Sequence, residues 1–468
     1  MGNHSIQVIL KLGLAMVASM ILTGCMIQAK QETVSDEKTT IVTIWTKDRH
    51  DAAYQEARVN EYNESNPDNI RVEYRIYSDN YAQALSSAFQ SNSAPDIMAY
   101  TDQVFNQFYA QDYFADIIPY MDQELKETFQ NVMIDGINMF DGKCYFIPVC
   151  ATTPRLFYNK TLFQRAGIEE PPETMEEMIE DAQLITSLYS DEGIYGFAAN
   201  MNHAQSALER SLMAQANREI GIKTGYDFKN GTYDFTGYEQ IIQSWRTLLS
   251  EECAFPQCEL LDIDPLRELF AEGKIGMYIS YIHSEAGVYQ EQFPMSDEWD
   301  CAEIPTSGGM LKGAQNYSLN NGYLFNKNSE HMDAAWNVYC ALFSDLEYQK
   351  EYYMRGYGIS VIPEVIQQAE EAGYEPKSQM LLLGIHDKRW PKTPLEENPE
   401  AVRVEGQDLY EVFKRLIFGK EEILPALEEL TERYNEAYQT GIRNHVGRNI
   451  GIEDFNSMNP ELTVGEQK

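Results

Sequence analysis

Two cysteines, Cys144 and Cys150, lie six positions apart in the stretch FDGKCYFIPVCATTPRLFYNK. Two neighbouring thiols can form a disulfide, bind a metal ion or carry out redox chemistry. On an extended chain, however, this spacing covers about 20 Å at roughly 3.3 Å per residue, whereas a disulfide needs Cα atoms within about 7 Å of each other. If the stretch is a straight strand, these two thiols cannot pair.

The other cysteines of the chain body give no stronger signal. The six contain no CxxC pair, and no histidine stands beside them at the spacing of zinc ligands. They could form disulfides in an exported protein, but the sequence does not select a pairing. We expect several to be buried free thiols, and we expect no metal and no cofactor. The remaining four are Cys253, Cys258, Cys301 and Cys340.

Catalytic motifs are also missing from the sequence. It contains no GxSxG elbow, no HExxH zinc site and no Walker loop. A glycoside hydrolase would need two carboxylates about 5–10 Å apart. Among 73 acidic residues such a pair can arise by chance, so an exported carbohydrate-active enzyme remains the alternative. We predict that the chain is not an enzyme.

Length and charge limit the remaining function classes. A chain of 468 residues is long enough for two or three domains, and 43% hydrophobic with 23% charged residues is typical of a globular protein. The formal net charge of −37 argues against nucleic-acid binding, because that affinity comes mainly from Lys and Arg on phosphates. The acidity indicates a well-solvated surface.

The N-terminus differs from the rest of the chain. Its apolar run from Leu12 to Leu22 is shorter than the roughly 20 residues that span a bilayer and has the size of a signal-peptide core. The run ends in Leu-Thr-Gly-Cys25, which resembles the lipobox of bacterial lipoproteins. That resemblance implies a signal peptide at 1–24, lipid on Cys25 and a flexible tether over 25–40. The alternative is an ordinary signal peptide with a chance cysteine.

Strands and helices alternate after the tether. The β-branched run Thr39–Thr46 predicts a buried strand, and a helix is expected over Ala52–Ser65. Alternation of Val72, Tyr74 and Ile76 with charged residues predicts a second strand. Further elements expected are a helix near Tyr81–Gln90, strands at Ile97–Tyr100 and Lys274–Tyr281, helices opened by capping boxes at Thr174/Glu177 and Ser344/Glu347, and an amphipathic helix at Ile423–Tyr438. This order predicts an α/β fold with parallel sheet.

An ordered series of motifs along nearly the whole mature chain is similar to the extracellular solute-binding proteins of bacterial ABC importers, the class typified by maltose-binding protein. The motifs are the lipobox, TIVTIWT, APDIMAY, DYFADIIPYM, DGKCYFIPV, LFYNKTLFQRAGIEEPPETMEEM, EGIYGF, FAEGKIGMYIS, IPTSGG and HMDAAWNVYCALFSDLEYQKEYYMRGYGISVIPEV. Met175 stands where the family usually has Trp, and the two cysteines within DGKCYFIPVC are atypical.

The resemblance implies the periplasmic-binding-protein-like fold, in which two α/β lobes enclose a ligand cleft and are joined by crossing hinge segments. The first lobe would take residues 41–150 and 315–350, and the second 155–302 and 360–468. Hinge crossings would lie at 150–155, 302–315 and 350–360. The protein would be a lipoprotein held outside the cytoplasm on the bacterial cell membrane. It would act as a monomer that binds its solute by lobe closure and delivers it to ABC permease subunits.

Ligands in such folds lie outside the carboxyl ends of the strands, so strand ends and crossings supply candidate contacts. Flat aromatic rings suit the C–H faces of a sugar, and carboxylate, amide and guanidinium groups suit its hydroxyls. We therefore expect a carbohydrate ligand. The candidates are Trp45, Lys47, Asp48, Tyr100, Asp102, Arg155, Tyr281, His283, Asn316, Tyr317 and Trp390.

Several candidates have a plain structural alternative. Trp45 equally suits the protein core, Asp102 a helix cap, and His283 a surface or hydrogen-bonded position. The same fold could also serve another solute or a sensing role, since the sequence does not separate these from sugar import.

Overall fold

A computed structural model of the chain describes residues 39–77 and 80–463. Among these residues no helix is both long and apolar enough to cross a membrane. The expected signal peptide (1–24), the lipidated Cys25 and nearly all of the tether lie outside the described residues.

The first sheet has the strand order β15-β3-β1-β2. Strand β1 runs parallel to β2 and β3, and β15 is antiparallel to β3. Val42, Ile44 and Thr46, which share one side of β1, are fully buried, whereas Ile41 on the other side is exposed; this asymmetry favours the observed register against β2. The strands are β15 Tyr323–Phe325, β3 Ile97–Ala99, β1 Thr40–Thr46 and β2 Ile70–Ile76; helices α1 Ala52–Ser65, α2 Tyr81–Gln90, α3 Asp102–Tyr109 and α4 Gln123–Phe129 follow them. The strands and helices expected here from the sequence are confirmed.

The second sheet has the order β12-β7-β11-β8. Strand β7 is antiparallel to both β11 and β12, and β8 is parallel to β11. Its strands are β12 Trp299–Ala302, β7 Pro154–Asn159, β11 Ile275–Tyr281 and β8 Tyr195–Phe197. The helices around it are α5 Lys160–Ala166, α6 Met175–Tyr189, α7 Ala204–Arg210, α8 Leu212–Glu219, α9 Glu239–Leu248, α10 Ile263–Ala271, α11 Ile282–Gly287, α15 Pro394–Glu397, α16 Leu409–Phe418 and α17 Ile423–Arg443.

Of the two capping boxes predicted from the sequence, the structure contains one. Thr174 and Glu177 form the expected capping box of α6. The second expected box is wrong: Asp345 caps helix α13 (Leu346–Met354) by accepting from the Tyr348 amide. The Ser344 hydroxyl instead donates to the Cys340 carbonyl, because Ser344 ends the preceding helical segment, Cys340–Ser344.

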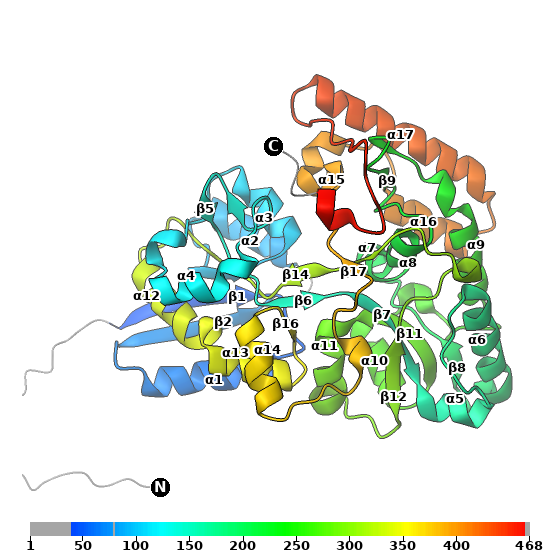
Figure 1. Cartoon of the computed structure of the whole chain (residues 1–468), viewed down its shortest axis with the longest axis horizontal. Coiled ribbons are helices and arrows are strands. Elements are labelled where there is room, and N and C mark those ends of the chain that lie inside the picture. The colour runs from blue at the N-terminus through cyan, green and yellow to red at the C-terminus, as the bar shows by residue number, and fades with distance from the viewer. Residues whose placement is uncertain (1–38, 78–79, 464–468) are drawn as a thin grey trace, which may run out of the picture. The chain divides into compact units, whose positions relative to one another are not determined.

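A third sheet crosses between these two groups of elements (Figure 1). Its order is β14-β6-β16, and both outer strands are antiparallel to β6. The strands are β14 Ser318–Asn320, β6 Cys150–Thr152 and β16 Ile359–Ser360. Small two-stranded sheets pair β13 Gln315–Asn316 with β17 Asp387–Lys388, β9 Tyr226–Asp227 with β10 Thr232–Tyr233, and β4 Met139–Phe140 with β5 Lys143–Cys144.

Two hydrophobic cores lie on either side of this crossing sheet. Buried residues of the first core run from Val42 to Cys150 and from Tyr323 to Ala369. Those of the second run from Leu156 to Ile304 and from Leu381 to Ile450, joined by Ile359 of β16. We call the parts built on these cores the first lobe and the second lobe.

The lobe boundaries differ from the expected ones at two places. The second crossing strand is β14, at 318–320 rather than 302–315, because residues 315–316 pair with β17 in the second lobe. The chain also stays longer with the first lobe: helix α14, Pro363–Glu371, buries Val365 and Ala369 in the first core. These two side chains are four positions apart and so share one helix face.

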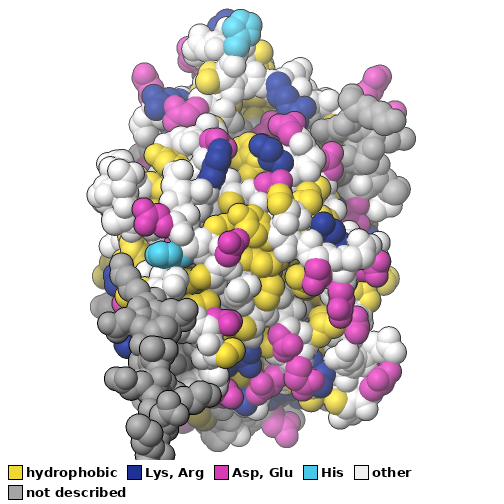
Figure 2. All heavy atoms as spheres, turned by 90° about the vertical axis from the view of Figure 1, so that its left-hand side faces the viewer, with side chains coloured by type: hydrophobic (Ala, Val, Ile, Leu, Met, Phe, Trp, Pro, Cys, Tyr) yellow, Lys and Arg dark blue, Asp and Glu magenta, His cyan; other side chains and the backbone are white. Residues whose placement is uncertain are grey.

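The cysteines of the body are free in this structure, and all are buried except the half-buried Cys340. Burial raises the pKa values of Cys144 and Cys150 to about 12. Since the thiolate is the reactive form, these positions are poorly suited to redox chemistry. On the first-lobe face shown in Figure 2, acidic and basic side chains are scattered among uncharged ones, and its described part shows no basic patch.

Candidate functional site

The loop after β1 brings charged side chains to the edge of the first lobe. Lys47 Nζ lies 2.7 Å from Asp48 Oδ1, and the Asp48 side chain is 20% exposed. Burial raises the pKa of Asp48, but the charges of Lys47, His50 and His283 outweigh it and lower the pKa to about 2. Asp48 is therefore a fixed negative charge at this edge.

The chain after β3 adds an aromatic and a carboxylate at the same edge. The Tyr100 ring stacks on Phe146 with centroids 3.8 Å apart, and its hydroxyl donates to Asp102 Oδ1 at 2.5 Å. Thr101, not Asp102, caps helix α3, because its hydroxyl accepts from the Val104 amide. Asp102 therefore stays exposed and is not used as the helix cap.

In the second lobe, β11 ends at Tyr281, and His283 follows in helix α11. The Arg210 guanidinium lies 5.3 Å from the centroid of the Tyr281 ring. His283 Nδ1 is 2.8 Å from the Thr152 hydroxyl on crossing strand β6. Burial lowers the pKa of His283 well below its usual value, and His50 and Lys47 add to this shift.

Direct contacts join the two lobes around these residues. The His50 and His283 rings meet edge to face with centroids 5.4 Å apart. Further contacts are an ion pair of Arg49 with Asp264 at 3.4 Å, an ion pair of Lys392 with Asp102 at 3.7 Å, and a hydrogen bond from Asn106 Nδ2 to the Glu396 carbonyl at 2.5 Å. We call this junction the interlobe site. It comprises Lys47, Asp48, Arg49, His50, Tyr100, Asp102, Glu209, Arg210, Asp264, Tyr281, His283, Lys392, Glu396 and Tyr410.

Eight of these residues are absent from the candidates predicted from the sequence, and six of the eight lie on the second-lobe side. The Tyr410 hydroxyl donates to Glu209 Oε1 at 2.7 Å. Burial raises the pKa of Glu209, and the negative charges of Glu396 and Asp102 add to that effect. Glu209 and Arg210 end the short helix α7, and Glu396 lies in α15, so none of them follows a strand. A search confined to strand ends cannot find them.

Three predicted residues lie in the protein interior. Trp45 is 8% exposed and packs on Tyr77 with ring centroids 4.3 Å apart. Trp390 is 4% exposed, and its indole N–H donates to the Ala314 carbonyl at 3.0 Å. Trp390 is therefore a core residue here, which differs from the expectation drawn from its polar sequence neighbours.

Arg155 is also buried, and it is held by a carboxylate. Its side chain is 2% exposed and forms two hydrogen bonds to Asp387, of 2.5 and 3.0 Å. A guanidinium already held by a buried carboxylate has few donors left for a ligand.

Asn316 and Tyr317 lie at the short β13–β17 sheet. The Asn316 side-chain oxygen accepts from the Trp390 amide at 3.0 Å. Tyr317 is half-buried, and burial together with Glu461 raises the pKa of its hydroxyl. The structure thus brings together Lys47, Asp48, Tyr100, Asp102, Tyr281 and His283, whereas the other five candidates lie elsewhere.

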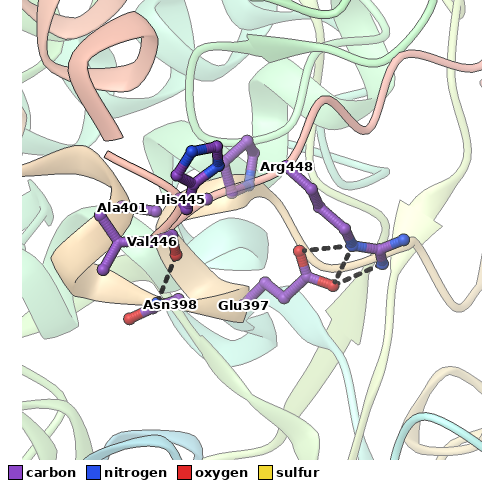
Figure 3. A pocket seen from close by; sticks show the side chains of 8 residues that line it. Glu397, Asn398, Ala401, His445, Val446 and Arg448 are labelled. Atoms are coloured by element: carbon purple, nitrogen blue, oxygen red, sulfur yellow. Dashed lines mark hydrogen bonds and ion pairs between the residues drawn. The ribbon is translucent and has the colours of Figure 1, made fainter. Parts of the chain in front are cut away.

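Within the described part of the chain, no three His, Cys, Asp or Glu side chains are grouped so that they could hold a metal ion. A hollow of about 320 Å³ lies beside α15, between Glu397, Asn398 and the segment around Val446 (Figure 3). Most of its charged and amide side chains already pair with one another: Arg448 with Glu397 at 2.6 Å, and Asn398 Nδ2 with the Val446 carbonyl at 2.8 Å. The interlobe site is therefore the better candidate.

Known proteins share this architecture. The family model described as bacterial extracellular solute-binding protein matches residues 46–344. A binding protein of Brucella abortus (strain 2308) is 23% identical over 262 residues, 56% of this chain; the match spans 61% of that relative's length.

Two solved structures show the same fold. One is an ABC transporter solute-binding protein from Thermotoga lettingae bound with α-D-tagatose, with a TM-score of 0.67, 16% identity, and coverage of 85% of this chain and 100% of that one. The other is an ABC substrate-binding protein from Listeria monocytogenes in complex with cycloalternan, with a TM-score of 0.64, 17% identity, and coverage of 86% and 99%. The fold is thus that of periplasmic solute-binding proteins, as the sequence predicted.

Proposed function

Because this chain belongs to the family of bacterial extracellular solute-binding proteins, we propose that it captures a carbohydrate between its two lobes and delivers it to the permease of an ABC transporter. We take the sugar to be an oligosaccharide, which side chains of both lobes and of the crossing strand β6 could contact together. The observation that carries the proposal is the mixture of aromatic and charged side chains gathered at the interlobe site.

The chemistry of these side chains suits a sugar. Tyr281, with Arg210 beside its ring, offers a flat face for C–H groups and a guanidinium for hydroxyls. Across the junction, Tyr100 and Asp102 offer the same pairing of ring and polar group. Sites of this kind combine apolar walls with a few placed polar groups. The two structural neighbours, bound with tagatose and with cycloalternan, support a carbohydrate over other solutes.

Closure of the lobes would provide the signal that the permease reads. Arg49 with Asp264 and Lys392 with Asp102 link the lobes in the present arrangement. These pairs cannot persist when the lobes separate, so they belong to the closed state. A ligand that contacts both lobes stabilises that state by its differential affinity.

The proposal includes the surroundings of the protein. Lipid on Cys25 would hold the chain on the outer face of the bacterial cell membrane, and the polar segment up to residue 40 would act as a tether. The protein would work as a monomer that meets the permease subunits, and it would release its sugar chemically unchanged.

Titration calorimetry of the purified protein against mono- and oligosaccharides tests this function, with chromatography of the recovered sugar. We expect one sugar per chain, recovered intact. Hydrolysis of the sugar would favour the carbohydrate-active enzyme instead, and failure to bind any sugar would overturn the proposed ligand class.

A matched pair of variants locates the site. Tyr281→Ala removes the ring beside Arg210 and should weaken sugar binding at least tenfold. Tyr189→Ala removes a similar pair, because the Arg165 guanidinium lies 4.5 Å from the Tyr189 ring. Since Tyr189 is remote from the interlobe site, its variant should bind the sugar as the parent does. Equal losses in both variants would exclude Tyr281 as a ligand contact.

A further inference from the structure

A second hollow, of about 470 Å³, lies where the two cores meet but outside the interlobe site. Tyr289 and Trp299 of the second lobe line it from one side, and Tyr353 of the first lobe lines it from the other. Leu382, on the segment that returns to the second lobe, packs against both cores. A molecule in this hollow would therefore touch both lobes.

The inner wall of the hollow is aromatic. Tyr289, Trp299 and Tyr353 are only 4%, 5% and 5% exposed. The Tyr289 and Trp299 rings meet edge to face at 5.5 Å, and Tyr353 meets Tyr374 in the same way at 5.1 Å. Such rings present faces and edges on which another flat ring can pack.

Close backbone contact at the base of the hollow keeps its walls in place. The Gly287 amide of α11 donates to the Gly356 carbonyl across the lobes at 3.1 Å. A Cβ on Gly356 would come within 2.7 Å of the Ala286 Cβ, and one on Gly287 within 2.8 Å of the Tyr357 ring. Larger residues at these two positions would force the segments apart, so glycine permits the approach.

One cation stands at the opening with its hydrogen-bond donors unused. Lys377 Nζ lies 4.3 Å from the centroid of the Trp299 ring, and it has no ion pair with any described residue. Burial lowers the pKa of Lys377, while Asp300 and Glu298 oppose that shift from a distance. Arg355, the other cation of the lining, already pairs with Glu291 at 3.1 Å and Glu351 at 2.9 Å.

We propose that this hollow is a second binding site, for a small molecule with a flat apolar body and one anionic group. The body would pack between Trp299 and Tyr353, and the anion would take the donors of Lys377. The volume falls within the roughly 300–1,000 Å³ of small-molecule sites. At about 30 Å³ per water it equals about sixteen waters, which leaves room for an acid with two or three rings.

Fluorescence titration with 1-anilinonaphthalene-8-sulfonate tests the proposal, because this probe joins flat rings to one sulfonate. The folded protein should show one saturable site. Lys377→Glu should weaken the probe at least tenfold, and Gln290→Trp, which adds a ring at an exposed position of the lining, should abolish saturable binding. Lys420→Glu is the matched control, an exposed lysine outside the lining, and it should bind the probe within twofold of the parent.

Circular dichroism and the thermal midpoint establish that each variant is folded before its titration is interpreted. Absence of saturable binding to the parent would overturn the proposal. So would a Lys377→Glu variant that binds the probe as the parent does, or a Lys420→Glu variant that loses it equally. The sugar titrations are independent of this test, so a negative result at one site does not overturn the proposal for the other.

Discussion

Acidification should weaken ligand binding through His283. This imidazole lies at the junction of the lobes, where its Nδ1 contacts the Thr152 hydroxyl and its ring meets that of His50. Burial lowers the pKa of His283 well below its usual value in this arrangement. The charged and titratable groups around it are Lys47, His50, Asp48 and Arg267.

The direction of the pH effect on ligand affinity follows from the lowered pKa of His283. A base whose pKa is depressed in the closed arrangement prefers to be neutral there, so protons favour separation of the lobes. Binding is therefore strongest above the ordinary pKa of histidine and falls as the pH drops through it. Asp48 does not obscure the effect, because its pKa of about 2 keeps it ionised throughout.

The size of the change in affinity follows from the protonation of the His283 imidazole when the lobes are separated. With a pKa of about 6.5 in separated lobes, about one-tenth of His283 is protonated near pH 7.5 and about nine-tenths near pH 5.5. If only the neutral form closes, the affinity should fall about tenfold over this range, or about 1.4 kcal/mol. This figure counts His283 alone.

Calorimetric titration of the parent with its sugar near pH 7.5 and pH 5.5 measures the effect. His283→Asn, which keeps a polar group beside Thr152, should reduce the change to less than about twofold. His331→Asn alters an exposed histidine and should retain the tenfold change. Equal affinity of the parent at both pH values, or a tenfold loss persisting in His283→Asn, would refute the reasoning.

Three further predictions concern stability and closure. Asp387→Asn leaves the buried Arg155 guanidinium without its counter-ion, and urea unfolding should show a loss of about 3–5 kcal/mol; a loss under about 1 kcal/mol would mean that water reaches the pair. A double-mutant cycle of Arg49→Gln with Asp264→Asn should give a coupling below about 1 kcal/mol in ligand affinity, because the pair is partly exposed; a larger coupling would make it a major closure contact. Trp390→Ala should cost about 3–5 kcal/mol of stability yet change sugar affinity less than threefold, whereas a tenfold change would place Trp390 in the ligand site.

Many helices and strands could be predicted because the residues that mark each element lie within that element or at its start. Strand β1 is marked by its β-branched run, and helix α6 by the Thr174/Glu177 capping box. The same reasoning placed a cap at Ser344, where Asp345 serves instead. Both side chains can accept a backbone hydrogen bond, so only the end of the preceding helical segment decides between them.

The candidate site could be predicted only in part because its two halves come from different structural rules. Tyr100 follows strand β3 and Tyr281 ends strand β11, and the carboxyl ends of these strands face the junction. Glu209 and Glu396 reach the same junction from helices whose position depends on packing of the whole second lobe. Nothing in their local sequence sets them apart from the many other acidic residues.

Trp390 shows why a polar neighbourhood misleads. Its sequence context, HDKRWPKTP, reads as an exposed loop. In the folded chain its indole meets Ala314 and Phe455, which are far away in sequence. Long-range contacts of this kind decide burial, and a single sequence does not reveal them.

Arg155 illustrates a different point, since the sequence placed it at the 150–155 crossing but gave no partner for its side chain. Asp387 accepts from both Arg155 and the Thr153 hydroxyl, so β17 is fixed to the point where β6 passes into β7. The Thr153 hydroxyl also lies 3.2 Å from the Asn316 carbonyl, which is its alternative acceptor.

This network ties two crossing segments together at their second-lobe ends. Strand β17 pairs with β13, which leads directly into crossing strand β14, so both β6 and β14 leave the second lobe from one fixed point. Bending should then concentrate at the first-lobe ends of these strands. At that end, Asn321 adopts a φ of 58° and Gly322 packs against the Phe146 ring. No buried ion pair like that of Arg155 with Asp387 is found among the described residues at this end. If the lobes close on a ligand as proposed, the buried ion pair would fix one end of the hinge. Loss of the Arg155 side chain should then weaken binding even if Arg155 does not contact the ligand.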